Sequence, residues 1–321
     1  MTSLIRLAVA LRGLALAACT VVLQRLTYGL HTLGVDGGYT QQDVTEVARA
    51  FTGRTIDRPR QDARFVFCPV THDPGDKTVL GRPIRAGGER DGEEVLDLLA
   101  RHPSTARFIA AKLARRFVAD DPPPALVERV AAVYRDTGGD IRAMLRAIVA
   151  APEFLAPGVA GAKIKKPTEF VASAARAVGA TVDARGALTL ARVAAEIGEG
   201  FYEVVPPTGY PDRAQAWVNP GALLARLNFA LALAEGRLPG VSTDLDGLLR
   251  GADRRRPQAV LEHLLATLLH GRAGAETRAV LAAHLNQPDI TRLTADDRGP
   301  ADTDVAKLTA LVLGSPEFQR R

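Results

Sequence analysis

Cysteine is nearly absent from this 321-residue chain, which contains only Cys19 and Cys68. Two cysteines cannot form a disulfide framework, and their spacing is not that of a zinc-binding motif. The sequence also has no run that approaches the roughly 18 apolar residues needed for a membrane-spanning helix. We therefore expect neither a disulfide-rich scaffold nor a transmembrane span.

Familiar catalytic signatures are missing as well. No serine lies in a G-x-S-x-G pattern, and the chain has no Walker loop and no G-x-G-x-x-G. Residues 34–38 are rich in glycine, but no strand precedes them, so they indicate a loop and not a phosphate cradle. The net charge of +5 is mild for this length. Because arginines alternate with acidic residues, the pattern favours a solvated surface and gives no clear sign of nucleic-acid binding.

Aromatic residues are also scarce, at 5%, whereas alanine and leucine dominate, and this mixture favours helices over strands. Apolar residues recur at helical spacing in segments separated by proline and glycine. A loose stretch at residues 156–162 divides the chain, and the pattern of residues 145–154, which ends in Pro-Glu-Phe, reappears at 308–318. We expect a mainly α fold, a multi-helical orthogonal bundle that spans residues 30–321 in two similar subdomains, about 30–156 and 163–321.

Three helical segments allow specific local predictions. Thr40 and Asp43 have the spacing of a helix-capping pair, and so do Asp91 and Glu94. In a helix over residues 104–118, the periodicity predicts that the inward face carries Phe108, Ile109, Leu113 and Phe117.

Residues 64–84 form the one segment whose period changes from helical to alternating. Phe65 and Phe67 alternate with polar or smaller residues, and Asp73-Pro-Gly-Asp76 has the composition of a tight turn before a second short apolar run. We expect one small two-stranded hairpin that lies against the helices.

This turn also gathers the densest set of ionisable side chains, which are His72, Asp73, Asp76 and Lys77. An imidazole close to two carboxylates is what a metal or acid–base site requires, and His31 is a candidate added ligand. The competing interpretation, which the residue types favour, is plain turn chemistry. In it, Asp73 stabilises the turn, Asp76 and Lys77 are solvated, and His72 binds a carbonyl group.

A long loop at residues 199–220 holds a second candidate site, made of Tyr202, Tyr210 and Trp217. These aromatic side chains are suited to stacking on a sugar ring or another flat ligand. The alternative, which we favour, is that they plug the loop onto the helices.

Residues 1–29 have a basic residue near their start, Arg6, followed by an apolar stretch, which is the outline of an export signal. Leu16-Ala-Ala-Cys19 is similar to the lipobox of bacterial lipoproteins, so Cys19 is a lipidation candidate. Arg12 interrupts the apolar run, and an amphipathic helix is the alternative. An export signal implies a periplasmic or cell-surface location, and its absence implies a cytoplasmic one.

Several ordered blocks resemble the bacterial domain-of-unknown-function 1800 family. They are Leu30-His-Thr-Leu-Gly-Val, His102-Pro-Ser-Thr-Ala-Arg-Phe, Lys166-Pro-Thr-Glu-Phe, Pro206-Pro-Thr-Gly-Tyr and Ser315-Pro-Glu-Phe. The resemblance implies a helix-rich, often exported protein, frequently encoded beside relatives of sulfatases and alkaline phosphatases. It transfers no catalytic residue. It covers the C-terminal part of the family domain, which implies a truncated member, and Tyr210 stands where members often have Trp.

Two functions are compatible with these observations. The first is an exported or cell-surface helical accessory protein that binds a sulfatase-like partner encoded nearby. The second is a metal-assisted hydrolase centred on the His72-Asp73 turn. A decaying truncated copy of a larger protein is a third, weaker interpretation.

Overall fold

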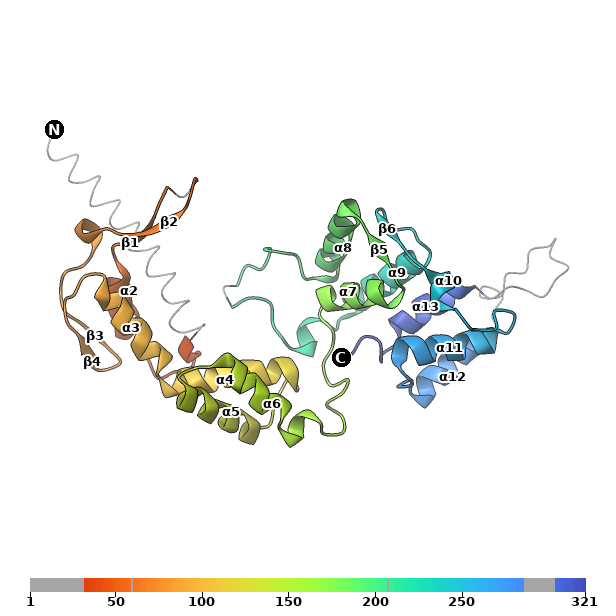
Figure 1. Ribbon diagram of the computed structural model, residues 1–321, viewed down its shortest axis with the longest axis horizontal. Coiled ribbons are helices and arrows are strands. Elements are labelled where there is room, and N and C mark those ends of the chain that lie inside the picture. Colours follow the sequence, from red (N-terminus) through yellow and green to blue (C-terminus); the bar gives the residue numbers. More distant parts are fainter. Residues whose placement is uncertain (1–31, 59, 207, 286–303) are drawn as a thin grey trace. The chain divides into compact units, whose positions relative to one another are not determined.

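The computed structural model describes residues 32–58, 60–206, 208–285 and 304–321 (Figure 1). Within these ranges the chain forms helices α2–α13 and three small two-stranded sheets. The predicted mainly α fold is therefore confirmed. None of the helices in these ranges combines the length and the apolar character needed to cross a membrane.

The described chain divides into two compact units. Unit 1 takes the described residues up to Phe117 together with Asp121–Leu155, and unit 2 takes Val118–Asp120 and Ala156–Arg321.

Unit 1 begins with α2 (Gln41–Phe51), which starts where the sequence predicts. The Thr40 hydroxyl accepts from the Asp43 backbone N–H, and the Asp43 carboxylate accepts from the Thr40 backbone N–H. This reciprocal capping satisfies two backbone donors that the first helical turn leaves free. The apolar face of α2 joins the core of unit 1, which contains Leu33, Val44, Val47, Ala50, Val79, Ile84, Val95 and Leu99.

Four further helices complete unit 1, namely α3 (Arg90–Ala100), α4 (Pro103–Phe117), α5 (Pro124–Thr137) and α6 (Ile141–Val149). The prediction for the inward face of α4 holds in part. Phe108, Ile109 and Leu113 are partly buried, whereas Phe117 is 44% exposed, and the alanines at 106, 110 and 114 are fully buried. Helix α4 packs along α5, and small buried side chains such as these alanines let neighbouring helices approach closely.

The single predicted hairpin is replaced by two antiparallel ribbons in unit 1. β1 (Arg54–Asp57) pairs with β2 (Arg64–Phe67), and β3 (Lys77–Val79) pairs with β4 (Arg82–Ile84). Leu80 and Gly81 have φ angles of 49° and 73°, the left-handed values of a two-residue hairpin turn. Leucine rarely adopts this conformation, so the sequence gives no clear signal for the turn.

Unit 2 has α7 (Pro167–Ala177), α8 (Ala184–Ile197), α9 (Pro220–Ala234), the short α10 (Leu245–Leu248), α11 (Pro257–Leu269), α12 (Ala275–His284) and α13 (Val305–Gly314). A third ribbon pairs β5 (Thr181–Val182) with β6 (Val241–Ser242). Helix α13 packs against α9 and α11 (Figure 1). Beyond α13, the ring of Phe318 is buried edge-to-face on Phe170, which in turn contacts Phe229.

Candidate functional site

The predicted turn site of unit 1 is organised around the ammonium group of Lys77. Lys77 points inward from β3, where Lys77 and Val79 are buried and Thr78 is exposed. Its Nζ donates to Asp91 Oδ2 at 2.5 Å and to the backbone oxygen of Asp73 at 2.6 Å. The side chains of Lys77 and Asp91 are both inaccessible to solvent, so this is a fully buried ion pair.

His72 lies against this ion pair. Its Nδ1 is 2.9 Å from the backbone oxygen of Thr52, and because a carbonyl group only accepts, Nδ1 carries a hydrogen. Its Nε2 is 3.1 Å from Asp91 Oδ2 and 3.5 Å from Lys77 Nζ. The imidazole therefore connects the end of α2 to the first turn of α3, and its side chain is only 5% exposed.

Asp91 is the residue of this cluster that sequence reasoning missed. The predicted capping pair of Asp91 and Glu94 is wrong, because α3 already starts at Arg90 and Asp91 lies inside its first turn. Burial alone would raise the pKa of Asp91, but hydrogen bonds from Lys77, the Gly87 N–H and His72 outweigh it and lower the pKa. A Cβ at Gly87 would lie 3.2 Å from Asp91 Oδ1, so this glycine gives the carboxylate its room.

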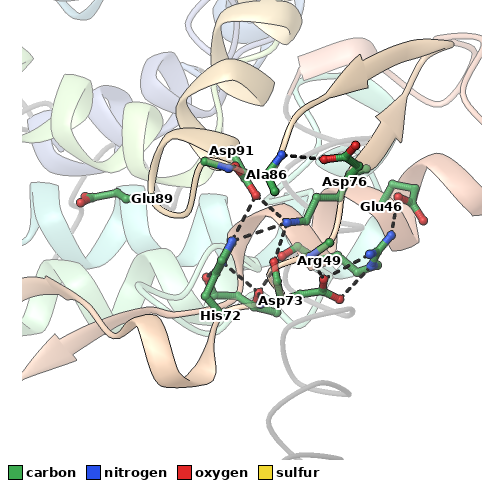
Figure 2. Close-up of polar contacts among 12 residues, drawn as sticks. Glu46, Arg49, His72, Asp73, Asp76, Ala86, Glu89 and Asp91 are labelled. Atoms are coloured by element: carbon green, nitrogen blue, oxygen red, sulfur yellow. Dashed lines mark hydrogen bonds and ion pairs between the residues drawn. The ribbon is translucent and has the colours of Figure 1, made fainter.

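Asp73 faces the opposite way, toward helix α2. Its carboxylate accepts two hydrogen bonds from Arg49, at 2.9 and 3.1 Å, and Arg49 also binds Glu46 at 2.8 Å (Figure 2). The Arg49 hydrogen bond holds the pKa of Asp73 down at about 2, and the two carboxylates raise the pKa of Arg49. Asp73 also accepts from the Gly75 N–H, which stabilises the turn as predicted.

Asp76 does not join the cluster. Its carboxylate accepts from the Ala86 N–H at 2.9 Å and from the exposed Arg85 at 3.4 Å. His31 lies outside the described residues, as does the lipidation candidate Cys19. The structure thus brings His72 and Lys77 together, places the Asp73 backbone beside them, and leaves Asp76 at the surface.

This geometry has a clear chemical consequence. In the part of the chain that the structure describes, no three metal-binding side chains converge. The donors and acceptors of the cluster bind one another, and a substrate has no direct access to Lys77 or Asp91. The contacts tie α2, β3 and α3 together, which is a structural role. They give no support to a metal-assisted hydrolase at the His72-Asp73 turn.

The three aromatic side chains in the loop at residues 199–220 of unit 2 have different surroundings. Trp217 is buried, with its indole N–H donating to the Pro211 oxygen at 3.0 Å. Tyr210 lies against it, with ring centroids 5.7 Å apart, and its hydroxyl donates to the Gly200 oxygen. Tyr202, in contrast, is fully exposed and has a φ of 62°. Tyr210 and Trp217 therefore hold the loop in place, whereas Tyr202 is directed to solvent.

An open groove on unit 1 offers a more accessible imidazole. His102 lines it together with Arg82, Glu94 and Asp97, which belong to β4 and α3. The backbone N–H of Ser104 donates to His102 Nδ1 at 3.2 Å, and burial, with a smaller contribution from Arg82, lowers the pKa of this histidine. The groove mixes both charges and presents no aligned nucleophile.

These features define a mainly helical protein whose buried polar clusters join its own elements. The chain belongs to the family described as "Protein of unknown function (DUF1800)", which matches residues 25–320 and so covers nearly the whole sequence. The resemblance expected from the sequence blocks is confirmed. Neither the curated proteins nor the solved structures contain a match to the chain.

Proposed function

We propose that this protein is an exported or cell-surface accessory protein that acts by binding, with a sulfatase- or alkaline-phosphatase-like protein encoded nearby as its partner. The main support is a contrast within unit 1. Its densest polar cluster is closed to solvent, whereas its β1–β2 ribbon carries large apolar side chains in the open.

The ribbon has the character of a docking element. Ile56 and Phe65 are opposite one another in the antiparallel register, and each is 57% exposed. Val66 on the other face of the ribbon is 39% exposed, and Val70 just beyond it is 93% exposed. Clustered exposed apolar groups of this kind are typical of interaction surfaces. A two-stranded ribbon also has free backbone groups along its edges, which a partner strand can pair with.

The base of the ribbon is fixed to the helices. The Arg54 guanidinium lies 5.5 Å from the ring centroids of both Phe51 and Phe65, and its Nη2 donates to the Glu89 oxygen at 2.8 Å. A Cβ at Gly92 would lie 2.7 Å from Arg54 Nε, so α3 has room for this arginine because residue 92 is glycine. A rigid base lowers the entropy that the ribbon loses on binding.

The proposed partner is tested by co-purification from the native host. Tagged full-length chain is compared with an Ile56→Ser/Phe65→Ser variant and with a Leu188→Ser control, whose leucine is 63% exposed on α8. We expect a sulfatase- or phosphatase-like protein to be retained by the wild type and the control and lost from the ribbon variant. Retention of no such protein would contradict the proposed partner, and equal retention by all three would contradict the ribbon surface.

Export is tested separately at Cys19. We expect cells that express the chain to incorporate a palmitate analogue into it, and Cys19→Ala to abolish the labelling. Labelling that is unchanged by the substitution would rule out lipidation at Cys19. Fractionation of the same cells then shows whether the chain reaches the envelope.

A further inference from the structure

The stretch that precedes α7 holds three lysines with different surroundings, at positions 163, 165 and 166. The backbone of this stretch pairs with the end of the chain, through a bridge between Ile164 and Arg320. The Lys165 N–H donates to the Gln319 oxygen at 2.8 Å, and the Arg321 N–H donates to the Lys163 oxygen at 2.8 Å. This pairing fixes Lys165 beside Phe318.

Lys163 and Lys166 have carboxylates as neighbours. Lys163 Nζ donates to Asp120 Oδ1 at 2.5 Å and lies 3.5 Å from Asp212 Oδ1, while Lys166 Nζ is 4.0 Å from the same Asp212 oxygen. Lys165 differs from both. Its Nζ lies 3.8 Å from the ring centroid of the buried Phe318, and among the described residues it forms no hydrogen bond or ion pair.

Other cations lie close to Lys165. Burial and then Arg272 lower the pKa of Lys165 to about 8, Glu169 opposes them, and Arg226 adds the smallest lowering effect. Near neutral pH an appreciable fraction of this side chain is therefore the free amine, which is the nucleophilic form. The side chain is only partly buried, so a small reagent has access to it.

Arg226 adds positive charge, and among the described residues no carboxylate is hydrogen-bonded to its guanidinium group. It is 1% exposed, and its two terminal nitrogens donate to Gln319 Oε1 and to the Lys165 oxygen, both at 2.8 Å and both uncharged acceptors. Its Nε is buried without a partner in the described chain. Glu169 acts on Lys165 and Glu199 acts on Arg226, but in the part of the chain that the structure describes neither carboxylate forms a hydrogen bond to these side chains. A nucleophilic amine beside two guanidinium groups attracts small anions.

We propose that Lys165 is a covalent binding site for small anionic carbonyl compounds, such as 2-oxo acids or aldehydes that carry a carboxylate or phosphate. The lysine nitrogen forms a bond to the carbonyl carbon, and the resulting carbinolamine loses water to give an imine. Both amine hydrogens leave with the carbonyl oxygen as that water, so no oxidant or reductant takes part. The positive surroundings select the anionic compound and oppose protonation of the free amine.

The experiment uses the full chain, glyoxylate as the anionic aldehyde and acetaldehyde as the neutral control. Imines are trapped with cyanoborohydride, and the modified lysine is located by peptide mass spectrometry. The lysines of the chain are Lys77, Lys112, Lys163, Lys165, Lys166 and Lys307, so each site is resolved separately. We expect glyoxylate to modify Lys165 about tenfold faster than the exposed Lys112, at a rate that rises with pH and levels off above pH 8.

Matched measurements make the result specific. We expect the preference for Lys165 to disappear in urea, and to be smaller with acetaldehyde than with glyoxylate. Arg272→Gln, a change at an exposed residue, should slow the modification of Lys165 by glyoxylate more than its modification by acetaldehyde. Modification of Lys165 no faster than Lys112 in the folded chain would overturn the proposed site. Equal preference with both aldehydes would overturn its selectivity for anions.

Discussion

Replacing Asp91 with asparagine tests the buried cluster of unit 1 directly. The substitution keeps the size of the side chain and leaves an oxygen to accept from the Gly87 N–H. It removes the negative charge that faces Lys77 Nζ at 2.5 Å, where both side chains are inaccessible to solvent. Lys77 is left with the Asp73 oxygen and His72 as neighbours, neither of which offers a full negative charge.

The cost follows from this geometry. Breaking a fully buried ion pair by removing one partner typically costs about 3–5 kcal/mol, because the remaining charge is desolvated without compensation. We expect Asp91→Asn to destabilise unit 1 by this amount. Lys77→Met should cost a comparable amount, whereas the double variant should lose much less than the sum of the two. The coupling free energy between the residues should then be near the upper end of the range for residues in contact, at about 3 kcal/mol.

Urea unfolding of the full chain measures the effect. Far-ultraviolet circular dichroism follows both units, whereas the fluorescence of Trp217, the only tryptophan, follows unit 2. We expect Asp91→Asn to shift the circular-dichroism transition and to leave the fluorescence transition in place. Asp76→Asn is the matched control, because Asp76 forms an exposed pair with Arg85 and its loss should cost less than about 1 kcal/mol.

Two outcomes would refute this reasoning. One is a loss of less than about 1 kcal/mol for Asp91→Asn, which is the range of exposed pairs. The other is simple additivity of Asp91→Asn and Lys77→Met, because residues that do not interact show no coupling.

Two further predictions concern pH. The folded state lowers the pKa of Asp73 to about 2, so the Arg49–Asp73 contact stabilises unit 1 above the ordinary pKa of aspartate and loses this effect as the pH falls toward 2. Acid unfolding followed by circular dichroism should show that the stability of unit 1 decreases over this pH range, and Asp73→Asn should make the decrease smaller. Lys165 has a folded-state pKa lowered to about 8, so its protonation opposes folding at neutral pH and ceases to do so at alkaline pH. Lys165→Met should raise the Tm at pH 7, with a difference that vanishes at about pH 11, above the ordinary pKa of lysine; a Tm that falls at pH 7 would contradict this.

The parts of the fold that sequence reasoning found depend on local patterns. The helix that Thr40 and Asp43 cap was predictable because the capping partners are three residues apart. The mainly α fold followed from repeated apolar stripes. The pairing of β2 was not predictable, because its partner β1 precedes it across a loop. The pairing of β3 with β4 was not predictable either, because leucine is unusual in the left-handed conformation that the Leu80-Gly81 turn requires.

The candidate site shows even more clearly that contacts between residues far apart in the sequence could not be predicted. His72, Asp73 and Lys77 were found because they are close in sequence, and their proximity suggested a common role. Asp91 completes the cluster from another element, and its sequence neighbours made it resemble an ordinary helix cap. Only the packing of α3 against α2 and β3 brings this carboxylate to Lys77, so the change from a candidate chemical site to a buried structural contact required the tertiary structure.

The central claim, that the protein works through its exposed ribbon and not through its buried cluster, has one direct measurement. It is the dissociation constant of the proposed sulfatase- or phosphatase-like partner, once purified, for the full chain and for the Ile56→Ser/Phe65→Ser variant. We predict at least about a tenfold weaker complex for the variant, which corresponds to about 1.4 kcal/mol. An unchanged dissociation constant in a variant that folds normally would contradict the claim.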